Sequence, residues 1–589
     1  MSTPRPAGPA PDLAASPVDD EDARAVATTV DRRSADEIEV DLRSRLLRAR
    51  PTDRLWGWLG PLVVAAIAAV LRLVNLNHPT RLIFDETYYV KQAYSLLTLG
   101  YEGQWEAEDA NDRFKEGDFS DLSTEANYVV HPQIGKWLIA VGLRLFGADN
   151  GAGWRFSAAI AGAVTVLLLA RITRRLLGST LLGTVAGFLL AIDGLHLTGS
   201  RIGLLDIFLG MFVVAALGAV LLDREQSRRR LARAAAADLA ARGDGRLSDP
   251  WGPRTGFRWW LVLAGVLLGL GAGVKWSSIY ALAVFGIVVV VWDLCARRAI
   301  GARLWFGAGV FRGGVPAFVA LVPVAAVTYV LGWFSWFASS GGYLRQWAAE
   351  QWAQNGTVER AWLPHALNSW WEYHRRMWDF HNGLDSEHSY EAHPAGWLLQ
   401  LRPTSFYWQS PAPGDPDCGA ERCVQAISSV GNPAIWWLGV LALVVVLWAA
   451  FARRDWRAWV VLAGYAATYL PWFAYSHRTI FTFYAIALAP FVALALTFAI
   501  GWLTGLLPPL HGGWSRARGR GDVAPLDGGA VRSDDLVGTA PRTRPGLVVI
   551  AAVCLLALAL FVFFWPVWTG QTLAYDAWRA RMWLGSFWI

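Results

Sequence analysis

Charged side chains are scarce in this chain of 589 residues. Asp, Glu, Lys and Arg make up 17% of it, whereas soluble domains contain about 25%. Hydrophobic residues reach 54%, and the 34 tryptophans are an abundance typical of proteins with aromatic belts at membrane interfaces. The shortage of charge therefore excludes an ordinary soluble protein and indicates a polytopic membrane protein.

The sequence also lacks the motifs of nucleotide-driven proteins. It contains no glycine-rich dinucleotide fingerprint in a strand-turn-helix context and no Walker pattern, which argues against a nucleotide-driven pump. The pI of about 9.2 could suggest nucleic-acid binding. The basic residues, however, lie in short stretches between apolar segments, where they orient membrane helices. We therefore expect no nucleic-acid partner.

Cysteine is rare, with four residues in the whole chain. Cys295 and Cys554 fall in or beside apolar segments, where cysteine usually serves packing. Cys418 and Cys423 lie in a polar loop, and we predict a disulfide between them if that loop faces an oxidising space. Histidines gather in the same loop, but none form a compact helical pair of the His-x₃-His type. No metal site is therefore predicted.

Eleven apolar stretches are long enough, or nearly so, to cross a bilayer, which takes about 20 residues in a helix. The sequence therefore predicts an all-α polytopic membrane protein with about 11 transmembrane helices. The predicted spans are 56–74, 154–169, 181–197, 202–222, 259–274, 279–294, 315–337, 435–451, 459–475, 480–503 and 546–565.

The distribution of arginine predicts the orientation of these helices. Clusters of Arg precede the first span and follow the second, fourth, sixth, eighth and tenth. Cytoplasmic loops carry such an excess, so we expect a plasma-membrane protein with its N-terminus in the cytoplasm and its C-terminus outside. The apolar segment Ile134–Phe146 has only 13 residues, too few to cross comfortably. A crossing there would reverse every later basic loop, so we predict an interfacial or re-entrant helix.

This topology predicts a multi-pass region flanked by polar segments. The N-terminal segment has no apolar periodicity and is expected to be disordered in the cytoplasm, and the cytoplasmic linkers are rich in Arg, Gly and Pro. The predicted divisions are the N-terminal segment 1–54, the multi-pass domain 55–589, the outer loops 75–153 and 338–433, and the cytoplasmic linkers 223–258 and 504–545.

A pair of carboxylates, Asp85 and Glu86, follows the first predicted span. Asp85 could simply cap the next helix, because Asp is favoured at that position. Capping does not explain a second carboxylate flanked by aromatic residues. Partial burial among those rings would raise the pKa of a carboxylate towards that of a useful general base. Asp85 is therefore the first candidate for catalysis.

A second candidate is the turn from His131 to Lys136, which precedes an apolar helix. A cation at a helix start opposes the positive end of the helix dipole, so Lys136 suggests that an anion binds nearby.

Ionisable groups at the outer ends of other predicted helices are costly and usually functional. Some of these side chains could simply extend their charged ends to the membrane interface, and two could pair with each other. Cations that converge on the outer side would also suit the binding of a lipid phosphate. These groups are Arg72, Arg155, Arg201, Asp206, Lys275, His477 and Arg478, of which Arg201 and Asp206 are the possible pair.

Together these segments resemble the protein O-mannosyltransferase family, in its bacterial, actinobacterial-like branch. The resemblance covers essentially residues 56–589, with the motifs in family order. The matching segments are Asn77-His-Pro, Phe84-Asp-Glu-Thr-Tyr-Tyr, His131-Pro-x-x-Gly-Lys, Gly153-Trp-Arg-Phe-Ser-Ala, Ser200-Arg-x-x-Leu-Leu-Asp, Gly273-Val-Lys-Trp and Ser476-His-Arg-Thr.

The resemblance implies a glycosyltransferase of the GT-C type with an active site facing outward. It implies inverting transfer of mannose from polyprenyl-phosphate-mannose to Ser or Thr hydroxyls of exported proteins, for which the secretion machinery is a candidate delivery route. It also implies that no metal or nucleotide cofactor is needed. Carried over by position, Asp85 is the catalytic base, Glu86 orients the site and Arg155 contacts the phosphate. Arg201, Lys275 and Arg478 are the further phosphate candidates, and His131, Lys136, Asp206 and His477 are the other site candidates.

Two departures from the family pattern matter. The usual His-Pro-Pro reads His131-Pro132-Gln133 here, and the loop 338–433 is too short for the β-trefoil domain of eukaryotic members. A related transferase acting on a glycan or lipid, of the arabinosyl or aminoarabinosyl type, would share the same features and remains an alternative. A transporter is the other alternative, but it would predict internal repeats, and none is visible.

Overall fold

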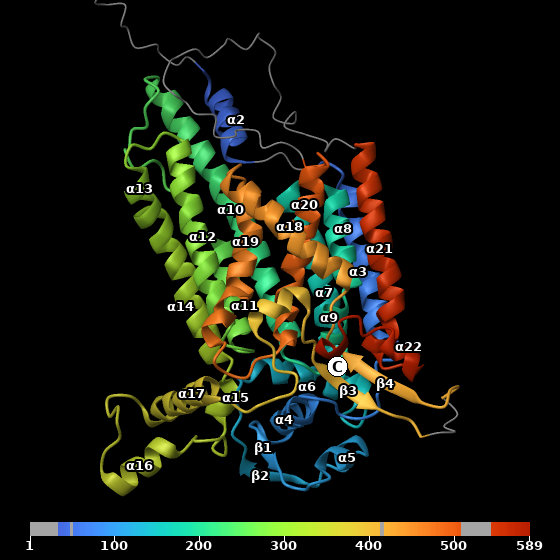
Figure 1. Ribbon diagram of the computed structural model, residues 1–589. Helices are drawn as coiled ribbons and strands as arrows, with labels where there is room; N and C mark the ends of the chain where they lie inside the picture. The colour runs from blue at the N-terminus through green and yellow to red at the C-terminus, as the bar shows by residue number, and fades with distance from the viewer. Residues whose placement is uncertain (1–32, 48–50, 413–417, 508–542) are drawn as a thin grey trace, which may run out of the picture.

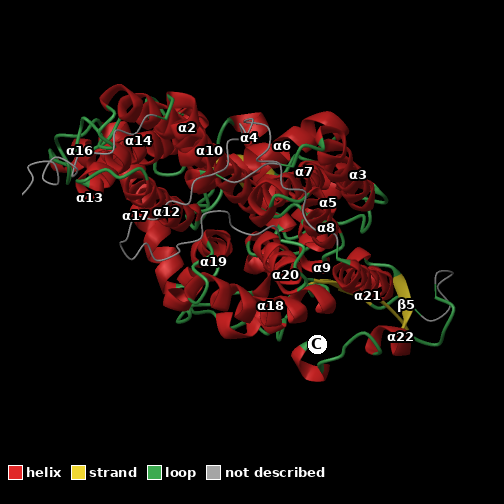
Figure 2. Ribbon diagram, turned by 90° about the horizontal axis from the view of Figure 1, so that it is seen from above, coloured by secondary structure: helices red, strands yellow, loops and turns green. Residues whose placement is uncertain are grey.

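The computed structural model describes residues 33–47, 51–412, 418–507 and 543–589. Long helices form a bundle, and short helices and small β-sheets gather at its lower end in Figure 1. Viewed down the bundle in Figure 2, α14 and α3 lie towards opposite sides, with α10 and α7 between them. Their burial agrees, since the apolar part of α10 is 78% buried and that of α3 only 22%. The core therefore lies along α7 and α10.

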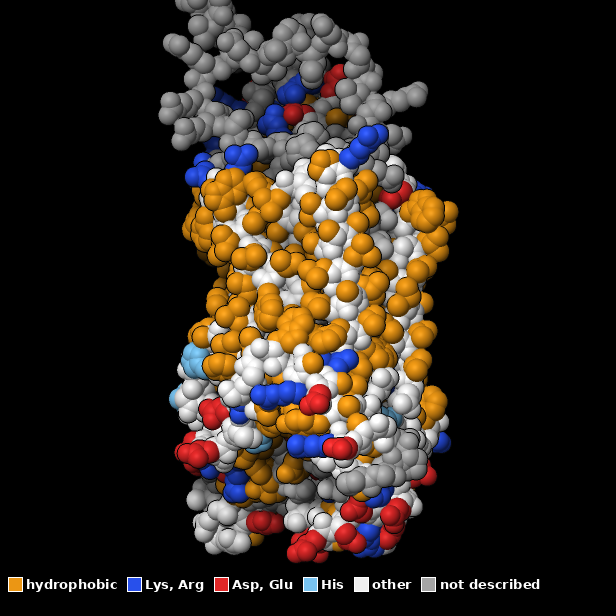
Figure 3. Space-filling view, turned by 45° about the vertical axis from the view of Figure 1, so that its right-hand side comes forward, with side chains coloured by type: hydrophobic (Ala, Val, Ile, Leu, Met, Phe, Trp, Pro, Cys, Tyr) orange, Lys and Arg blue, Asp and Glu red, His pale blue; other side chains and the backbone are white. Residues whose placement is uncertain are grey.

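Seven helical stretches are long and apolar enough to cross a membrane within the described residues. Their exposed surfaces are apolar, and Figure 3 shows a broad hydrophobic band with charged side chains towards both ends. Such a surface suits lipid contact. The stretches are α3 (Arg54–Leu73), α7 (Gly151–Leu177), α10 (Asp206–Arg242), α12 (Ser278–Ala299), the continuous run Trp305–Leu331, α18 (Pro433–Phe451) and α21 (Arg544–Thr569). The continuous run consists of α13 (Trp305–Ala308), the π-helical turn η1 (Gly309–Gly314) and α14 (Val315–Leu331).

The other four predicted spans are shorter or interrupted, so the number of crossings stays a prediction. The span 181–197 breaks at Asp193, whose carboxylate accepts a hydrogen bond from the backbone N–H of His196 and starts a new helix. The remaining breaks fall where 3₁₀ turns meet α-helices. The elements concerned are α8 (Thr180–Ala191), α9 (Gly194–Gly199), α11 (Trp259–Ala272), α19 (Trp456–Thr468), η3 (Leu470–Tyr475), η4 (Thr482–Ala487) and α20 (Ala489–Leu503).

The prediction of a disordered N-terminal segment is wrong for helix α2 (Ala35–Leu46). Ser34 and Glu37 form a reciprocal capping box at its start. Ile38 and Leu42, one turn apart, are buried in a hydrophobic cluster that includes Leu231 of α10. The capping box and this spacing were the signals in the sequence. Residues 1–32 lie outside the described residues.

The predicted linker 223–258 is also wrong in its first half, because α10 continues to Arg242. Ala, Arg and Leu are strong helix formers, and the helix ends where Gly243 adopts a positive φ of 67°. Asp223 and Arg258, at the two ends of this segment, form a buried ion pair. Most of the predicted linker 504–545 lies outside the described residues.

The first predicted outer loop folds into short elements at the lower end of the bundle (Figure 1). Helix α6 forms with the bounds expected from the sequence and packs against α4 and α7. Two short strands pair in antiparallel fashion beside them. The elements are α4 (Glu86–Leu99), β1 (Gly103–Trp105), α5 (Ala110–Lys115), β2 (Leu122–Ala126) and α6 (Ile134–Phe146).

The second predicted outer loop lies at the same end. Strands β3, β4 and β5 form an antiparallel sheet that joins this loop to the C-terminal segment. A disulfide links Cys418 to Cys423, the first residue of β4, with a Cα–Cα distance of 5.7 Å. The elements of the loop are α16 (Trp347–Asn355), α17 (His365–Gly383), η2 (Pro394–Leu399), β3 (Ser405–Gln409) and β4 (Cys423–Ser428). Helix α15 (Phe334–Ala338) precedes them, and the C-terminal segment contributes β5 (Thr572–Ala574), α22 (Tyr575–Arg579) and η5 (Gly585–Phe587).

Candidate active site

Asp85 lies at the start of α4, in a loop fixed by aromatic packing. Phe84, the preceding residue, has a positive φ of 49°, which is unusual for a bulky side chain and concentrates at functional sites. Its ring packs at 5.0 Å from the Phe406 ring and 5.3 Å from the Phe483 ring. Asp85 occupies the N-cap position of α4 but makes no side-chain capping hydrogen bond. Capping therefore does not account for this carboxylate.

The surroundings of Asp85 favour a proton-accepting role. Burial raises the pKa of Asp85 to about 6, against the opposing effect of the Lys275 ammonium. The Asp206 carboxylate raises the pKa further, while a hydrogen bond from Tyr89 lowers it. Tyr89 is four residues along α4, so one helical turn brings its hydroxyl to Asp85. A pKa near neutrality suits a general base.

Lys275 and Asp206 form a buried ion pair beside Asp85. The Lys275 Nζ lies 2.7 Å from the Asp206 Oδ2, and it also lies 5.0 Å from the centre of the Tyr484 ring. Asp206 is the first residue of α10, and Lys275 lies in the turn between α11 and α12. The possible pairing of Arg201 with Asp206 is therefore replaced by the pair with Lys275.

Glu86 faces the protein interior and pairs with Arg155. Both side chains are fully buried. The Arg155 Nε and Nη2 donate to the two Glu86 carboxylate oxygens at 2.7 and 2.9 Å, which is the two-bond geometry of strong arginine–carboxylate pairs. Glu86 also accepts backbone N–H groups of Ile83 and Gly203. Glu86 thus positions the loop that carries Asp85.

The structure corrects the predicted role of Arg155 as a phosphate contact. An arginine has five N–H groups, and those left over from Glu86 donate to three backbone carbonyls near Asp85. No donor of Arg155 therefore remains for a substrate phosphate in this arrangement. The three carbonyls belong to Leu76, Pro79 and Arg81.

Arg201 is also committed to the protein backbone. Its guanidinium donates to four carbonyls at and just beyond the end of α3, which otherwise lack helical partners. Arg72, buried within α3, interacts with His196 and Ser200 of the α9 segment. Both Nη atoms of Arg201 thus cap α3, and its role as a phosphate ligand stays a prediction. The four carbonyls belong to Leu71, Arg72, Val74 and Asn75.

The anion expected beside Lys136 is a residue of this chain. Lys136 is fully buried and forms an ion pair with Glu102. Gln133 donates to the other Glu102 oxygen at 2.9 Å and accepts a hydrogen bond from Ser335. Lys136 also donates to the His131 carbonyl. Gln133, which replaces the second proline of the family pattern, is thus part of a structural hydrogen-bond network. The expectation of an external anion at Lys136 is wrong.

His131, His381 and Arg478 form a group close to Lys275. The rings of His131 and His381 stack with centroids 5.0 Å apart. Burial lowers the pKa of His381 to about 4, and burial lowers the pKa of His131 well below its usual range. His381 accepts from Arg478 through Nδ1, at 3.4 Å, and donates from Nε2 to the Val130 carbonyl at 2.6 Å. Both imidazoles are therefore neutral near pH 7.

Arg478 retains donor capacity that Arg155 lacks. It is 9% exposed, and its Nε has no hydrogen-bond partner within the part of the chain that the structure describes. The neighbouring His477 is exposed, and its ring lies 6.3 Å from the Tyr475 ring. Lys275 is therefore the predicted phosphate ligand that the structure brings to Asp85, and Arg478 lies beside His381 and Tyr484, which belong to the same site.

A cavity adjoins this site. Asp206 and Tyr484 line it, together with largely apolar side chains that include Leu209 and Trp472. Sequence reasoning missed Tyr89, Tyr484 and His381 as members of the site. Only Tyr89 carried a usable signal, its spacing of four residues from Asp85. Tyr484 and His381 arrive from distant segments through tertiary packing.

A carboxylate with a raised pKa beside a lysine, at one end of a bundle of apolar helices, is the arrangement expected of a membrane-embedded transferase. One chain of the Saccharomyces cerevisiae protein O-mannosyltransferase Pmt1-Pmt2 complex, solved with its sugar donor, shares this fold at 14% identity, with a TM-score of 0.62 over 93% of this chain and 94% of that one. The fold is therefore of the GT-C glycosyltransferase type.

Sequence relatives identify the family. The family model described as dolichyl-phosphate-mannose-protein mannosyltransferase matches residues 130–237, and that of the C-terminal four-helix region of protein O-mannosyltransferase matches 366–588. The polyprenol-phosphate-mannose–protein mannosyltransferase of Mycobacterium tuberculosis H37Rv is 36% identical, over 91% of this chain and 93% of that protein. The Corynebacterium glutamicum protein of the same name is 32% identical, over 89% and 92%. The chain belongs to the protein O-mannosyltransferase family.

Proposed function

We propose that this protein transfers mannose from polyprenyl-phosphate-mannose to Ser or Thr hydroxyls of acceptor proteins, with Asp85 as the general base. The observation that supports this most is the half-buried Asp85, whose pKa burial raises to about 6 next to Lys275. The relatives at 32% and 36% identity are named for the same reaction. The proposed reaction is a single displacement at C1 of mannose, which inverts the configuration of that carbon.

The transfer needs one proton acceptor and a stabilised leaving group. Asp85 accepts the proton of the hydroxyl while that oxygen attacks C1 of mannose from the face opposite the phosphate. The bond between C1 and the phosphate oxygen breaks, and polyprenyl phosphate leaves as an anion. No general acid is required, because the leaving group departs without a proton.

Lys275 and Arg478 are our candidates for stabilising the phosphate. The phosphate gains charge as the bond to the sugar breaks, so cations fixed at this position act more strongly on the transition state than on the bound donor. The charge of Lys275 is balanced by Asp206 at 2.7 Å. No salt bridge from Arg478 to a carboxylate occurs among the described residues, and its Nε is unpaired there. Arg478 is therefore the better candidate for direct phosphate binding.

The proposed reaction takes place on the outer face of the plasma membrane, on exported proteins. The arginines that end α7 and continue along α10 lie towards the end of the bundle opposite Asp85. An excess of Arg favours the cytoplasmic side, which would leave Asp85 outside. Acceptors would then arrive as they leave the secretion machinery.

The direct test uses purified protein, labelled polyprenyl-phosphate-mannose and a Ser/Thr-rich peptide. We expect labelled mannose on the peptide and none on a matched peptide in which every Ser and Thr is replaced by Ala. Parallel reactions with polyprenyl-phosphate-arabinose and with a glycan acceptor test the related transferase. Transfer of arabinose, or of mannose to the glycan only, would refute the proposed substrates.

A further inference from the structure

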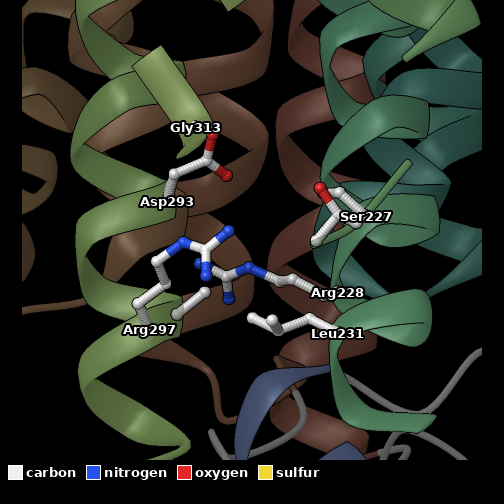
Figure 4. Close-up of a pocket in the computed structure, with 8 residues that line it drawn as sticks. Ser227, Arg228, Leu231, Asp293, Arg297 and Gly313 are labelled. Atoms are coloured by element: carbon white, nitrogen blue, oxygen red, sulfur yellow. The ribbon is translucent and has the colours of Figure 1, made fainter. Parts of the chain in front are cut away.

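A second cavity lies far from Asp85, at the arginine-rich end of the bundle. Arg228 on α10 is 22 residues beyond Asp206, which corresponds to about 33 Å along a helix. Figure 4 shows the side chains of Arg228 and Arg297 reaching towards one another from α10 and α12. The lining residues are Ser227, Arg228, Leu231, Thr255, Asp293, Ala296, Arg297 and Gly313.

Positive charge is in excess around this cavity. Arg258 pairs with the two nearby carboxylates, those of Asp223 and Asp293. Arg228 donates only to the carbonyls of Leu46 and Trp292, and Arg297 only to those of Trp251 and Pro253, among the hydrogen bonds of the described residues. Backbone carbonyls satisfy the donors, and the Asp293 carboxylate, which already pairs with Arg258, compensates the two charges only in part. A protein rarely keeps such charges unpaired.

A third arginine increases this excess. Arg224 lies one helical turn before Arg228 on α10 and is only 7% exposed. It stacks on the Trp456 ring at 3.6 Å, and its Nε has no hydrogen-bond partner in the described parts of the chain. The described residues supply no carboxylate within ion-pair distance of Arg224, Arg228 or Arg297. The three guanidiniums thus create a strong local preference for an anion.

The wall of the cavity is shaped by an irregular helix turn. Gly313 belongs to η1, a π-helical turn, and such turns recur at functional sites. Its carbonyl accepts a hydrogen bond from Arg258 at 3.4 Å. A Cβ at this position would lie 2.8 Å from the Cβ of Asp293, so only glycine permits this close approach. The π turn therefore brings a third backbone segment against the two arginine-bearing helices.

We propose that this cavity binds a phosphate group, supplied by the headgroup of an anionic phospholipid. Guanidiniums hold phosphate through paired N–H donors, and basic pockets between helices at a membrane interface suit lipid headgroups. The hydroxyl of Thr255 adds a donor at the same wall. Phe257 and Phe311, 58% and 63% exposed, lie in the adjoining segments and can contact acyl chains. Free phosphate shares the headgroup chemistry but would gain nothing from these exposed rings.

The test compares the full-length protein in three kinds of nanodisc. The first contains phosphatidylcholine, the second adds phosphatidylglycerol, and the third is phosphatidylcholine with inorganic phosphate in the buffer. Binding to the folded state raises thermal stability, and we expect phosphatidylglycerol to raise Tm by about 2 °C. The rise should vanish in the Arg228→Gln/Arg297→Gln variant.

The matched control is Arg233→Gln/Arg246→Gln, which removes the same charge from exposed arginines at the same end. It should keep the full rise with phosphatidylglycerol. A rise with inorganic phosphate that needs Arg228 and Arg297 would identify free phosphate as the source. The absence of any rise, or an equal rise in both double variants, would overturn the proposal.

A second measurement covers the case in which the double variant does not fold. Native mass spectrometry of the wild type after delipidation should show one phosphatidylglycerol retained per chain. Arg228→Lys keeps the charge but lacks the paired donors, so we expect its retained fraction to fall severalfold. Equal retention by Arg228→Lys and wild type would contradict binding through the guanidinium.

Discussion

Replacing Arg155 should destabilise the protein more than it weakens donor binding. In the structure both members of the Arg155–Glu86 pair are fully buried, and Arg155 holds three backbone carbonyls as well. Removing one partner of a buried pair costs about 3–5 kcal/mol, because the other charge is left unpaired. We expect Arg155→Ala to lower Tm by roughly 2–4 °C. Arg155→Lys should recover only part of this, because one ammonium cannot reproduce five fixed donors.

Thermal unfolding and initial rates against donor concentration separate this role from phosphate binding. In preparations of Arg155→Lys that remain folded, we expect a lower kcat, as the Asp85 loop loses its position, and an almost unchanged KM for the donor. Arg144→Ala, an exposed arginine on α6, serves as control and should change stability by less than about 0.5 kcal/mol. A normal Tm with a strongly raised donor KM in Arg155→Lys would refute the positioning role.

Other parts of the account make separate predictions. Arg478→Ala should raise the donor KM about tenfold or more, because a charge-assisted hydrogen bond contributes about 1.5–3 kcal/mol, and Arg478→Lys should recover part of it; an equal effect of His477→Ala would contradict the assignment. Serine at both disulfide positions should cost little activity, because the loop closed by the bond is short; free thiols in the wild-type protein would contradict the pairing. In a background without the two free cysteines, an impermeant thiol reagent on intact cells should label Asp109→Cys and leave Arg246→Cys unlabelled; the reverse pattern would overturn the orientation.

Apolar length predicted the long helices but not their interruptions. The run that became α21 is apolar throughout, the run that became α3 carries one charge, Arg72, near its end, and the bounds of both differ from the prediction by a few residues. The run 181–197 contains Asp193, and hydropathy alone gives no sign that one carboxylate will end a helix and start another. The basic tail of α10 has the composition of a linker, yet its residues favour helix and α2 packs on it.

The chemistry of the site was easier to predict than the partners of its charges. Asp85 was recognisable because a pair of carboxylates among aromatic residues has no ordinary structural explanation. Arg155, Arg201 and Lys136 were not separable from phosphate ligands, since their partners are a buried glutamate or backbone carbonyls. These partners come from segments tens of residues away, and a single sequence does not show which helix ends will meet.

The central claim is that Asp85 takes the proton of the acceptor hydroxyl, and the pH dependence of kcat/KM tests it most directly. The base acts in its deprotonated form, so activity should be lost as pH falls through about 6 and level off above it, following the raised pKa of Asp85. Asp85→Asn should keep the wild-type Tm and donor KM while lowering kcat by roughly 10² to 10⁴. A folded Asp85→Asn protein with near wild-type kcat, or with the same acid limb near pH 6, would contradict the account.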